Sequence, residues 1–265
     1  MSHELLALSQ NIKLKPQTIN MEVHHHSHTE RKKWTHYIWE FFMLFLAVFC
    51  GFLAENQREH YVEHQREKQY MRSLVEDLET DTVELHRAMG IADVVAHYSD
   101  SVLMFLSSFK ISQQIPIRLA TLAGMAGQRQ VLINTDRTSS QLKNSGSMRL
   151  IRSKKISDLI LKYWKQIEET NISLDRYLLY RNSSRELVFK LWVLPKVYQS
   201  GLGIKQDSIQ QVRVIDPDPK KWDEFANLTS MCGEITRAAH LKNLQQQLNM
   251  AKELITMIKD EYHIK

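Results

Sequence analysis

The stretch Trp34–Ala54, WTHYIWEFFMLFLAVFCGFLA, decides the fold of this chain because it is the longest apolar run in the sequence. A helix of about 21 residues rises about 31 Å, close to the thickness of a bilayer core. Its apolar side chains occur on all sides of the helix rather than along one stripe, which is untypical of the surface helix of a soluble protein. Aromatic residues gather at its first end, as they do at membrane interfaces: Trp34, Tyr37 and Trp39. Glu40 is close enough to that end to reach the headgroups, so the stretch predicts a membrane-spanning helix.

Two other interpretations of this stretch compete with a membrane span. The uncharged part, Phe41–Ala54, is short enough to be a buried core helix. A cleaved signal peptide needs small residues at its exit, whereas this run passes directly into Glu55. Cys50-Gly51 resembles a lipoprotein site, but Phe49 is bulky where a small residue is needed. The sequence therefore favours an uncleaved anchor.

The charges on the two sides of the anchor predict its orientation. Basic residues precede it at Arg31-Lys32-Lys33, Lys13 and Lys15, and slightly outnumber those that follow at Arg58, Arg66 and Lys68. Because cytoplasmic flanks are enriched in Lys and Arg, the N-terminus is expected in the cytoplasm and the C-terminal part across the membrane. The chain is therefore expected to cross the membrane once.

The composition of the whole chain favours an all-α fold. The 265 residues include only 8 glycines and 5 prolines, which is few for a β-sandwich or barrel with many tight turns. The net charge of +5 arises from alternating basic and acidic residues, so solvated helix faces are expected and nucleic acid is not expected as a partner. The two cysteines, Cys50 and Cys232, are far apart and form no disulfide or zinc pattern.

Residues 1–33 are predicted to be a disordered cytoplasmic tail. The tail holds the run His24-His25-His26-Ser27-His28, which could chelate a metal. Adjacent histidines without cysteine or acidic partners make a weak and unspecific site, so no metal is predicted. Met21 is a possible second start of the chain.

The apolar spacing behind the anchor predicts a helical domain over 55–265. A helix without proline runs from Glu55 to about Lys110, with apolar residues at spacings of three, four and seven. Loops are expected near 111–147 and 195–221, and the first holds short helices over 117–125 and 139–144. Further helices are expected over 147–194, after Pro219, and from 234 to 262. The predicted fold is therefore all-α: one transmembrane helix (34–54) that continues into a long helix, followed by an antiparallel helical bundle.

No residues are assigned to catalysis, cofactor binding or metal binding. Ser140-Gln141-Leu142-Lys143 matches the S-x-x-K motif of serine enzymes, but its companion motifs are absent from the sequence. Gly201-Leu202-Gly203 lacks the third glycine and the strand of a dinucleotide site. Glycosylation patterns begin at Asn171, Asn182 and Asn227, and two of them fall inside predicted helices. No cofactor is expected.

Several segments resemble one bacterial family. These are Met21–His26 (MEVHHH), Gly51–Glu55 (GFLAE), Glu67–Tyr70 (EKQY) followed by Leu74, Asp77 and Leu78, and Gln141–Ile151 (QLKNSGSMRLI). From Met21 onward the chain resembles uncharacterised single-pass membrane proteins of Bacteroidota. The resemblance implies a bacterial envelope protein that starts at Met21, in which the 141–151 segment opens a long helix after a loop, and the expected location is the bacterial inner membrane. It implies no activity, cofactor or catalytic residue.

Three hypotheses about function follow. The first is a structural or interaction role, as a scaffold or accessory subunit that docks protein partners or a second copy, with Ala47-x-x-x-Gly51 and the 55–68 stretch as contacts. The second is a ligand sensor that signals through a separate partner; its small molecule is unknown. The third is an envelope enzyme, which would need a polar constellation in one of the two loops. A dry apolar core argues against the sensor, whereas a pocket lined by Asp136, Arg137 or Lys143 would favour the sensor or the enzyme.

Overall fold

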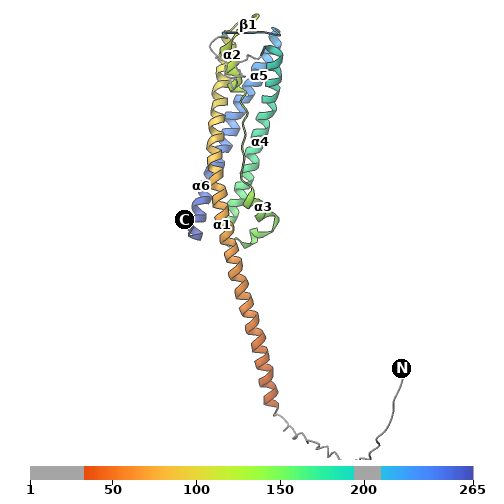
Figure 1. Ribbon diagram of the computed structural model, residues 1–265, viewed down its shortest axis with the longest axis vertical. Helices are drawn as coiled ribbons and strands as arrows, with labels where there is room; N and C mark the ends of the chain where they lie inside the picture. Colours follow the sequence, from red (N-terminus) through yellow and green to blue (C-terminus); the bar gives the residue numbers. More distant parts are fainter. Residues whose placement is uncertain (1–32, 194–209, 265) are drawn as a thin grey trace, which may run out of the picture. The chain divides into compact units, whose positions relative to one another are not determined.

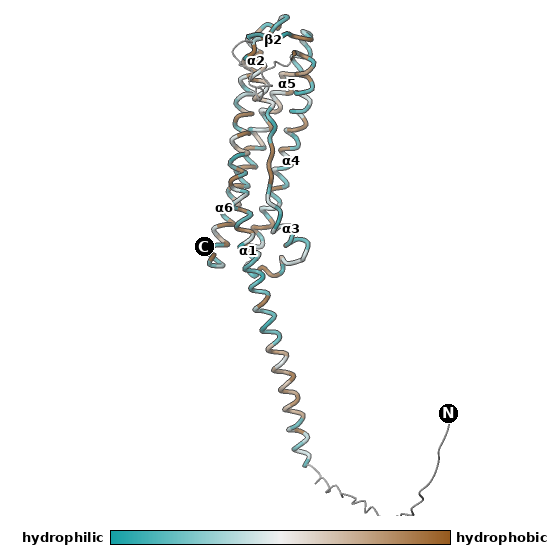
Figure 2. Tube along the Cα trace, in the orientation of Figure 1, coloured by the Kyte–Doolittle hydropathy of each residue, from teal (hydrophilic) through white to brown (hydrophobic). Residues whose placement is uncertain are grey.

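The first helix of the computed structural model, α1, runs without a break from Trp34 to Ser108 (Figure 1). The structure describes residues 33–193 and 210–264. Two units divide the chain, Met1–Gln57 and Arg58–Lys265, and each is described by itself. In the first unit, residues 34–57 form the start of α1, whose apolar part is coloured brown in Figure 2. The predicted continuation of this stretch into a long helix is confirmed.

The second unit is a bundle of long helices, as the sequence predicted. Short elements follow α1: β1 (Gln114–Pro116), α2 (Ile117–Ala126), α3 (Arg137–Asn144) and the 3-10 turn η1 (Ser147–Leu150). The later elements among the described residues are α4 (Lys154–Leu191), β2 (Gln211–Arg213), α5 (Pro219–Ile235), the π-helical turn η4 (Thr236–His240) and α6 (Leu241–Tyr262). The all-α fold class is therefore confirmed.

Residues 128–136, called the strap below, run extended along the bundle from α2 to α3 (Figure 1). Because the strap carries the chain back to the end where the bundle begins, α4 runs in the same direction as α1. The consecutive helices α5 and α6 then run against both. The bundle is thus antiparallel between α4 and α5–α6, and the strap takes the place of a fourth long element.

A regular seam of buried residues along α1 holds the bundle together. Buried positions recur at alternating steps of four and three, the heptad spacing of coiled coils. The seam consists of Glu67, Met71, Leu74, Leu78, Asp81, Leu85, Ala88, Ala92, Val95, Ser99 and Val102. Three of these residues are polar, and at these positions α1 forms hydrogen bonds in addition to apolar contacts.

Two large apolar clusters lie toward the two ends of the bundle. One joins the first part of the seam to the start of α4 and the end of α6, with Leu74, Ile160 and Leu254 among its members. The other gathers α2, β1, β2 and the end of α4 around Trp192, whose ring stacks on Trp222 at 5.4 Å between centroids. Smaller clusters lie between them. Burial of these side chains supplies most of the folding free energy.

A two-stranded sheet closes the second cluster and was not predicted. β1 and β2 pair antiparallel, with Ile115 opposite Val212. Strands of three residues are too short to show an alternating pattern, so these segments were assigned to loops.

Two helix boundaries differ from the predictions. The second long helix, α4, begins at Lys154 rather than at 147, because Ser147–Leu150 form a 3-10 turn and the Arg152 amide donates to a carboxylate of α1. The last two predicted helices form one continuous helical stretch through η4. The short helices over 117–125 and 139–144 and the start at Pro219 are confirmed within one or two residues. The predictions on 1–32 and on 194–209, with the histidine run and Gly201-Leu202-Gly203, lie outside the described residues.

Candidate functional site

Three buried carboxylates on α1 are the most unusual polar feature of the described bundle. Glu67, Asp77 and Asp81 are only 1%, 4% and 2% exposed. Acidic side chains are rarely this buried unless partners replace the lost water. The hydrogen-bond donors of each carboxylate therefore show what it does in the structure.

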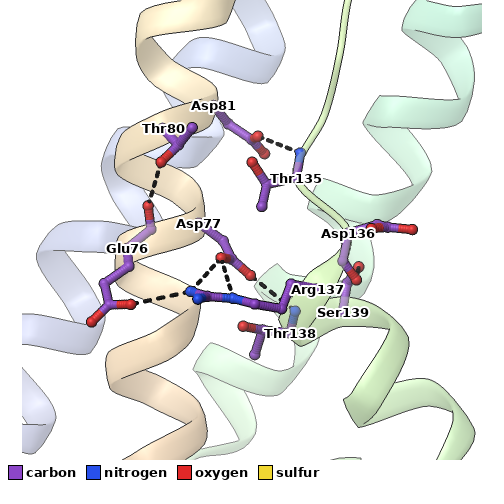
Figure 3. A network of polar contacts seen from close by, with 9 residues as sticks. All are labelled: Glu76, Asp77, Thr80, Asp81, Thr135, Asp136, Arg137, Thr138 and Ser139. Carbon is purple, nitrogen blue, oxygen red and sulfur yellow. Dashed lines mark hydrogen bonds and ion pairs between the residues drawn. The ribbon is translucent and has the colours of Figure 1, made fainter.

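Asp77 holds the start of α3 (Figure 3). One carboxylate oxygen accepts from Nε and a terminal nitrogen of Arg137, at 3.1 and 2.8 Å. The other oxygen accepts from the backbone amide of Thr138 at 2.9 Å. The terminal nitrogen of Arg137 also pairs with the exposed Glu76 at 3.1 Å. Asp77 thus satisfies both a charge and one of the free amides at a helix N-terminus.

Asp81, one turn further along α1, holds the end of the strap (Figure 3). Its carboxylate accepts from the Thr135 amide and from the Tyr163 hydroxyl, both at 2.7 Å. Burial raises the pKa of Asp81, and the hydrogen bonds from Thr135 and Tyr163 oppose that rise. Burial and the neighbouring Asp81 carboxylate also raise the pKa of Tyr163.

Glu67 fastens the segment before α4 in the same way. It accepts from the Arg152 amide and from the Tyr262 hydroxyl, both at 2.7 Å, and contacts His64 Nδ1 at 3.2 Å. The three carboxylates therefore accept three backbone amides from the region between α2 and α4. Their hydrogen bonds are made inside the protein, as expected of buried polar groups, and they join α1 to segments far away in sequence.

A buried polar layer surrounds η4 near the middle of the bundle. His240 Nδ1 lies 2.9 Å from the Ser173 hydroxyl of α4, and burial lowers the pKa of His240 to about 4. The Gln130 amide of the strap donates to the Thr236 hydroxyl at 3.2 Å. The amide of Gln247 on α6 donates to Asn134 at 2.7 Å. Single π-helical turns inside α-helices occur frequently at functional sites, so this layer is the second candidate.

Gly233 of α5 packs tightly against α1 beside this layer. A Cβ atom added there would lie 2.9 Å from Cβ of Ser99, a buried member of the seam. We expect Gly233→Ala to lower the free energy of unfolding by about 1–3 kcal/mol, because the packed helices must separate. Thermal unfolding followed by circular dichroism measures the change.

Gly90 provides the matched control for this substitution. It lies exposed in α1, and an added Cβ would meet nothing within 4 Å. Gly90→Ala is therefore expected to raise stability by about 0.5–1 kcal/mol through helix propensity alone. Equal effects of the two variants would contradict the tight contact at Gly233.

An open pocket of about 670 Å³ lies beside the first turns of the second unit. Its lining combines acidic residues of α1 with basic residues of the segment before α4: Glu59, His60, Glu63, Arg149, Leu150 and Arg152. A guanidinium nitrogen of Arg152 donates to the His60 carbonyl at 3.3 Å, which holds the two walls together. This pocket is the third candidate.

The three residues that the sequence analysis named as possible pocket residues contact other side chains of the bundle. Arg137 pairs with Asp77, and Lys143 lies over the Trp164 ring with its nitrogen 4.3 Å from the centroid. Asp136 precedes α3 and accepts from Ser140 at 3.5 Å. None of the three residues Asp136, Arg137 and Lys143 lines the pocket described above.

The two cysteines differ in burial, and the asparagines of the three glycosylation patterns lie in helices. Cys50 is exposed within the apolar stretch, whereas Cys232 is buried, and burial raises the pKa of its thiol to about 12. Asn171 and Asn182 lie in α4 and Asn227 lies in α5.

The sequence prediction missed the buried carboxylates, although a signal for two of them was present. Glu67 and Asp81 continue the spacing of Met71, Leu78 and Leu85 along α1. An acidic residue at a seam position is a candidate for burial with a partner. The partners come from the strap and from segments far away in sequence, and the spacing gave no sign of them.

Comparisons with protein-family models, with curated proteins and with solved structures give no match for this chain.

Proposed function

We propose that this protein is a single-pass membrane protein that holds a helical bundle at the membrane surface, where the bundle docks partner proteins. The observation that carries the proposal is the apolar start of α1. An 18-residue window there has a mean hydropathy of 2.0, and none of it is buried by the described residues. Soluble monomers rarely expose an apolar surface of this extent, so a bilayer is the environment that suits it best.

The charge pattern supports one orientation. Arg31-Lys32-Lys33 before the apolar stretch favours a cytoplasmic N-terminus, with the bundle on the outer side of the inner membrane. The resemblance to single-pass proteins of Bacteroidota supports the same location in a bacterial envelope. Reporter fusions after Ala54 and at Lys265 test this orientation, and a cytoplasmic signal at both would overturn it.

An exposed apolar face on α4 supports the docking role. Leu161, Ile172 and Leu179 are 51%, 60% and 65% exposed. Their spacings of eleven and seven residues bring them to the same side of a helix. The three buried carboxylates of α1, Glu67, Asp77 and Asp81, accept internal hydrogen bonds that hold the bundle together, as a docking scaffold needs.

The docking role predicts a stable assembly. Purified in mild detergent, the 31.2 kDa chain is expected in a complex of defined stoichiometry with partners or further copies. Cross-linking with mass spectrometry should place partners beside α4, and Ile172→Asp with Leu179→Asp should release them. A monomer under these conditions would contradict the proposal.

Membrane insertion gives a separate prediction. Leu44→Arg combined with Val48→Arg is expected to move the protein out of the carbonate-resistant membrane fraction. Each arginine near the middle of a span costs about 3 kcal/mol of insertion free energy. The control is Val83→Arg, which places the same charge on an exposed apolar position of α1 in the bundle. Fractionation followed by immunoblotting measures the distribution, and unchanged membrane retention of the double variant would argue against a span.

The buried polar layer favours ligand sensing as a second candidate function. Gln130 Oε1 and Gln247 Oε1 are buried without a hydrogen-bond partner among the described residues, and the amide of Gln130 donates to Thr236 of the π-helical turn. A small polar molecule that satisfied them would stabilise the bundle in proportion to its affinity. A thermal-shift screen with amino acids, sugars and nucleotides tests this role, and the absence of any shift would leave docking alone.

A further inference from the structure

One pocket must lie close to the apolar stretch, because only a few residues of the chain separate the two. This pocket is lined by Glu59, His60, Glu63, Arg149 and Arg152. Glu59 follows Ala54 by five residues. Even a fully extended chain spans only about 3.4 Å per residue, so the two residues are never more than about 17 Å apart. The headgroup layer beside a bilayer core is about 5–8 Å thick. If the apolar stretch spans a membrane, the Glu59 wall of the pocket therefore lies within about 17 Å of the end of the span, near the headgroup layer.

The pocket presents both signs of charge. Arg149 is exposed, and neither its guanidinium nor the Glu59 carboxylate forms an ion pair or a side-chain hydrogen bond within the part of the chain that the structure describes. Arg152 is held in place by the His60 carbonyl and lies 3.7 Å from Glu67. A guanidinium carries five donors, so Arg152 keeps some for a ligand. Glu63 lies 3.9 Å from His60 on the acidic wall.

We propose that this pocket binds the headgroup of a zwitterionic phospholipid with a primary ammonium group, phosphatidylethanolamine. Arg149 and Arg152 would bind its phosphate, because guanidinium and phosphate form paired, charge-assisted hydrogen bonds. Glu59 and Glu63 would accept from its ammonium, which has three N–H donors. The inference rests on the proposed membrane insertion and adds the lipid class that the bundle recognises.

The arrangement of charges separates this headgroup from the alternatives. The carboxylates of Glu59 and Glu63 repel an anionic headgroup that lacks an ammonium. A choline headgroup carries its positive charge on a nitrogen without N–H groups, so it cannot donate to a carboxylate. Lys154 and Lys155, exposed after the pocket, add attraction for phosphate but do not distinguish among phospholipids.

Hydrogen exchange of the full-length chain in nanodiscs tests the proposal. Three lipid compositions are compared: phosphatidylcholine alone, and phosphatidylcholine mixed with phosphatidylethanolamine or with phosphatidylglycerol. Peptides covering 58–64 and 147–153 are expected to exchange about threefold more slowly with phosphatidylethanolamine than with phosphatidylcholine alone, as for a site about two-thirds occupied. Equal exchange in the three lipids, or slowing by phosphatidylglycerol alone, would overturn it.

Two variants connect the effect to the pocket. Arg149→Gln and Glu59→Gln should each remove the difference between lipids, whereas Lys165→Gln, on an exposed turn of α4, should retain it. Retention of the lipid difference by both pocket variants would also overturn the proposal. Failure of the membrane anchor is distinguishable, because the chain would then not co-elute with nanodiscs of any composition.

Discussion

Asp77→Ala is expected to lower the free energy of unfolding of the bundle by about 3 kcal/mol. The substitution leaves the buried Thr138 amide without an acceptor and removes the counter-charge of Arg137. An unsatisfied buried amide costs about 1–3 kcal/mol, and a hydrogen bond to a charged group contributes about 1.5–3 kcal/mol. For a domain of this size the loss corresponds to a fall in Tm of about 6–12 °C.

The neighbouring Glu76 provides the control for Asp77. It pairs with the same Arg137, but its side chain is 67% exposed, so Glu76→Ala is expected to change stability by less than about 1 kcal/mol. Chemical denaturation measures both variants, and hydrogen exchange shows where the loss occurs. Faster exchange should be confined first to the strap and α3. Similar losses for the two variants would show that the buried carboxylate has no special role.

Acidification is expected to destabilise the bundle through His240. Its pKa is about 4 in the folded protein, whereas a solvated histidine has a pKa of 6.5, so the folded state binds fewer protons than the unfolded state below pH 6.5. Stability is therefore fully present above pH 6.5 and is lost as the pH falls toward 4. Linkage gives a loss of about 2 kcal/mol by pH 5 and about 3 kcal/mol by pH 4 from this group.

The comparison with His240→Gln isolates this contribution. Other groups also titrate in this range, and Asp81, whose pKa is raised by burial, shifts stability in the opposite direction. The contributions of these other groups are the same in wild type and in His240→Gln, so they cancel in the difference between the two free energies of unfolding. Urea unfolding between pH 7 and pH 4 should show a shallower loss in the variant, whereas His86→Gln, at an exposed position of α1, should follow wild type. Parallel curves for wild type and His240→Gln would show that His240 protonates without cost.

Much of the fold follows from local patterns in the sequence. The apolar spacing along α1, the lack of proline before Pro116 in that region and the stop at Pro219 predict the long helices and the start of α5. The helix 139–144 was predicted from Asp136, Thr138 and Gly146, and α3 begins only two residues earlier. These signals act within a few residues, so a single sequence displays them.

The rest depends on contacts between distant segments. Nothing in residues 128–136 shows that they lie extended along the bundle, because Arg87, Asp81 and Tyr177 of other helices supply their hydrogen bonds. The parallel direction of α1 and α4 follows from that path. The candidate pocket is equally non-local, since about 90 residues separate Glu59 from Arg149. The sequence predicted no binding residues there.

The π-helical turn η4 contains one residue more than an α-helical turn of the same span would need. Before it, buried residues recur at Trp222, Phe225, Thr229 and Cys232; after it, they recur at Leu244, Leu248, Ala251 and Leu254. An uninterrupted α-helix would instead turn polar residues such as Gln246 and Glu253 toward the core. The turn thus accommodates one additional residue, so that the apolar residues on both sides of it face the core. It marks a place in the chain where a change in length, rather than a change in side chain, is compatible with an intact core.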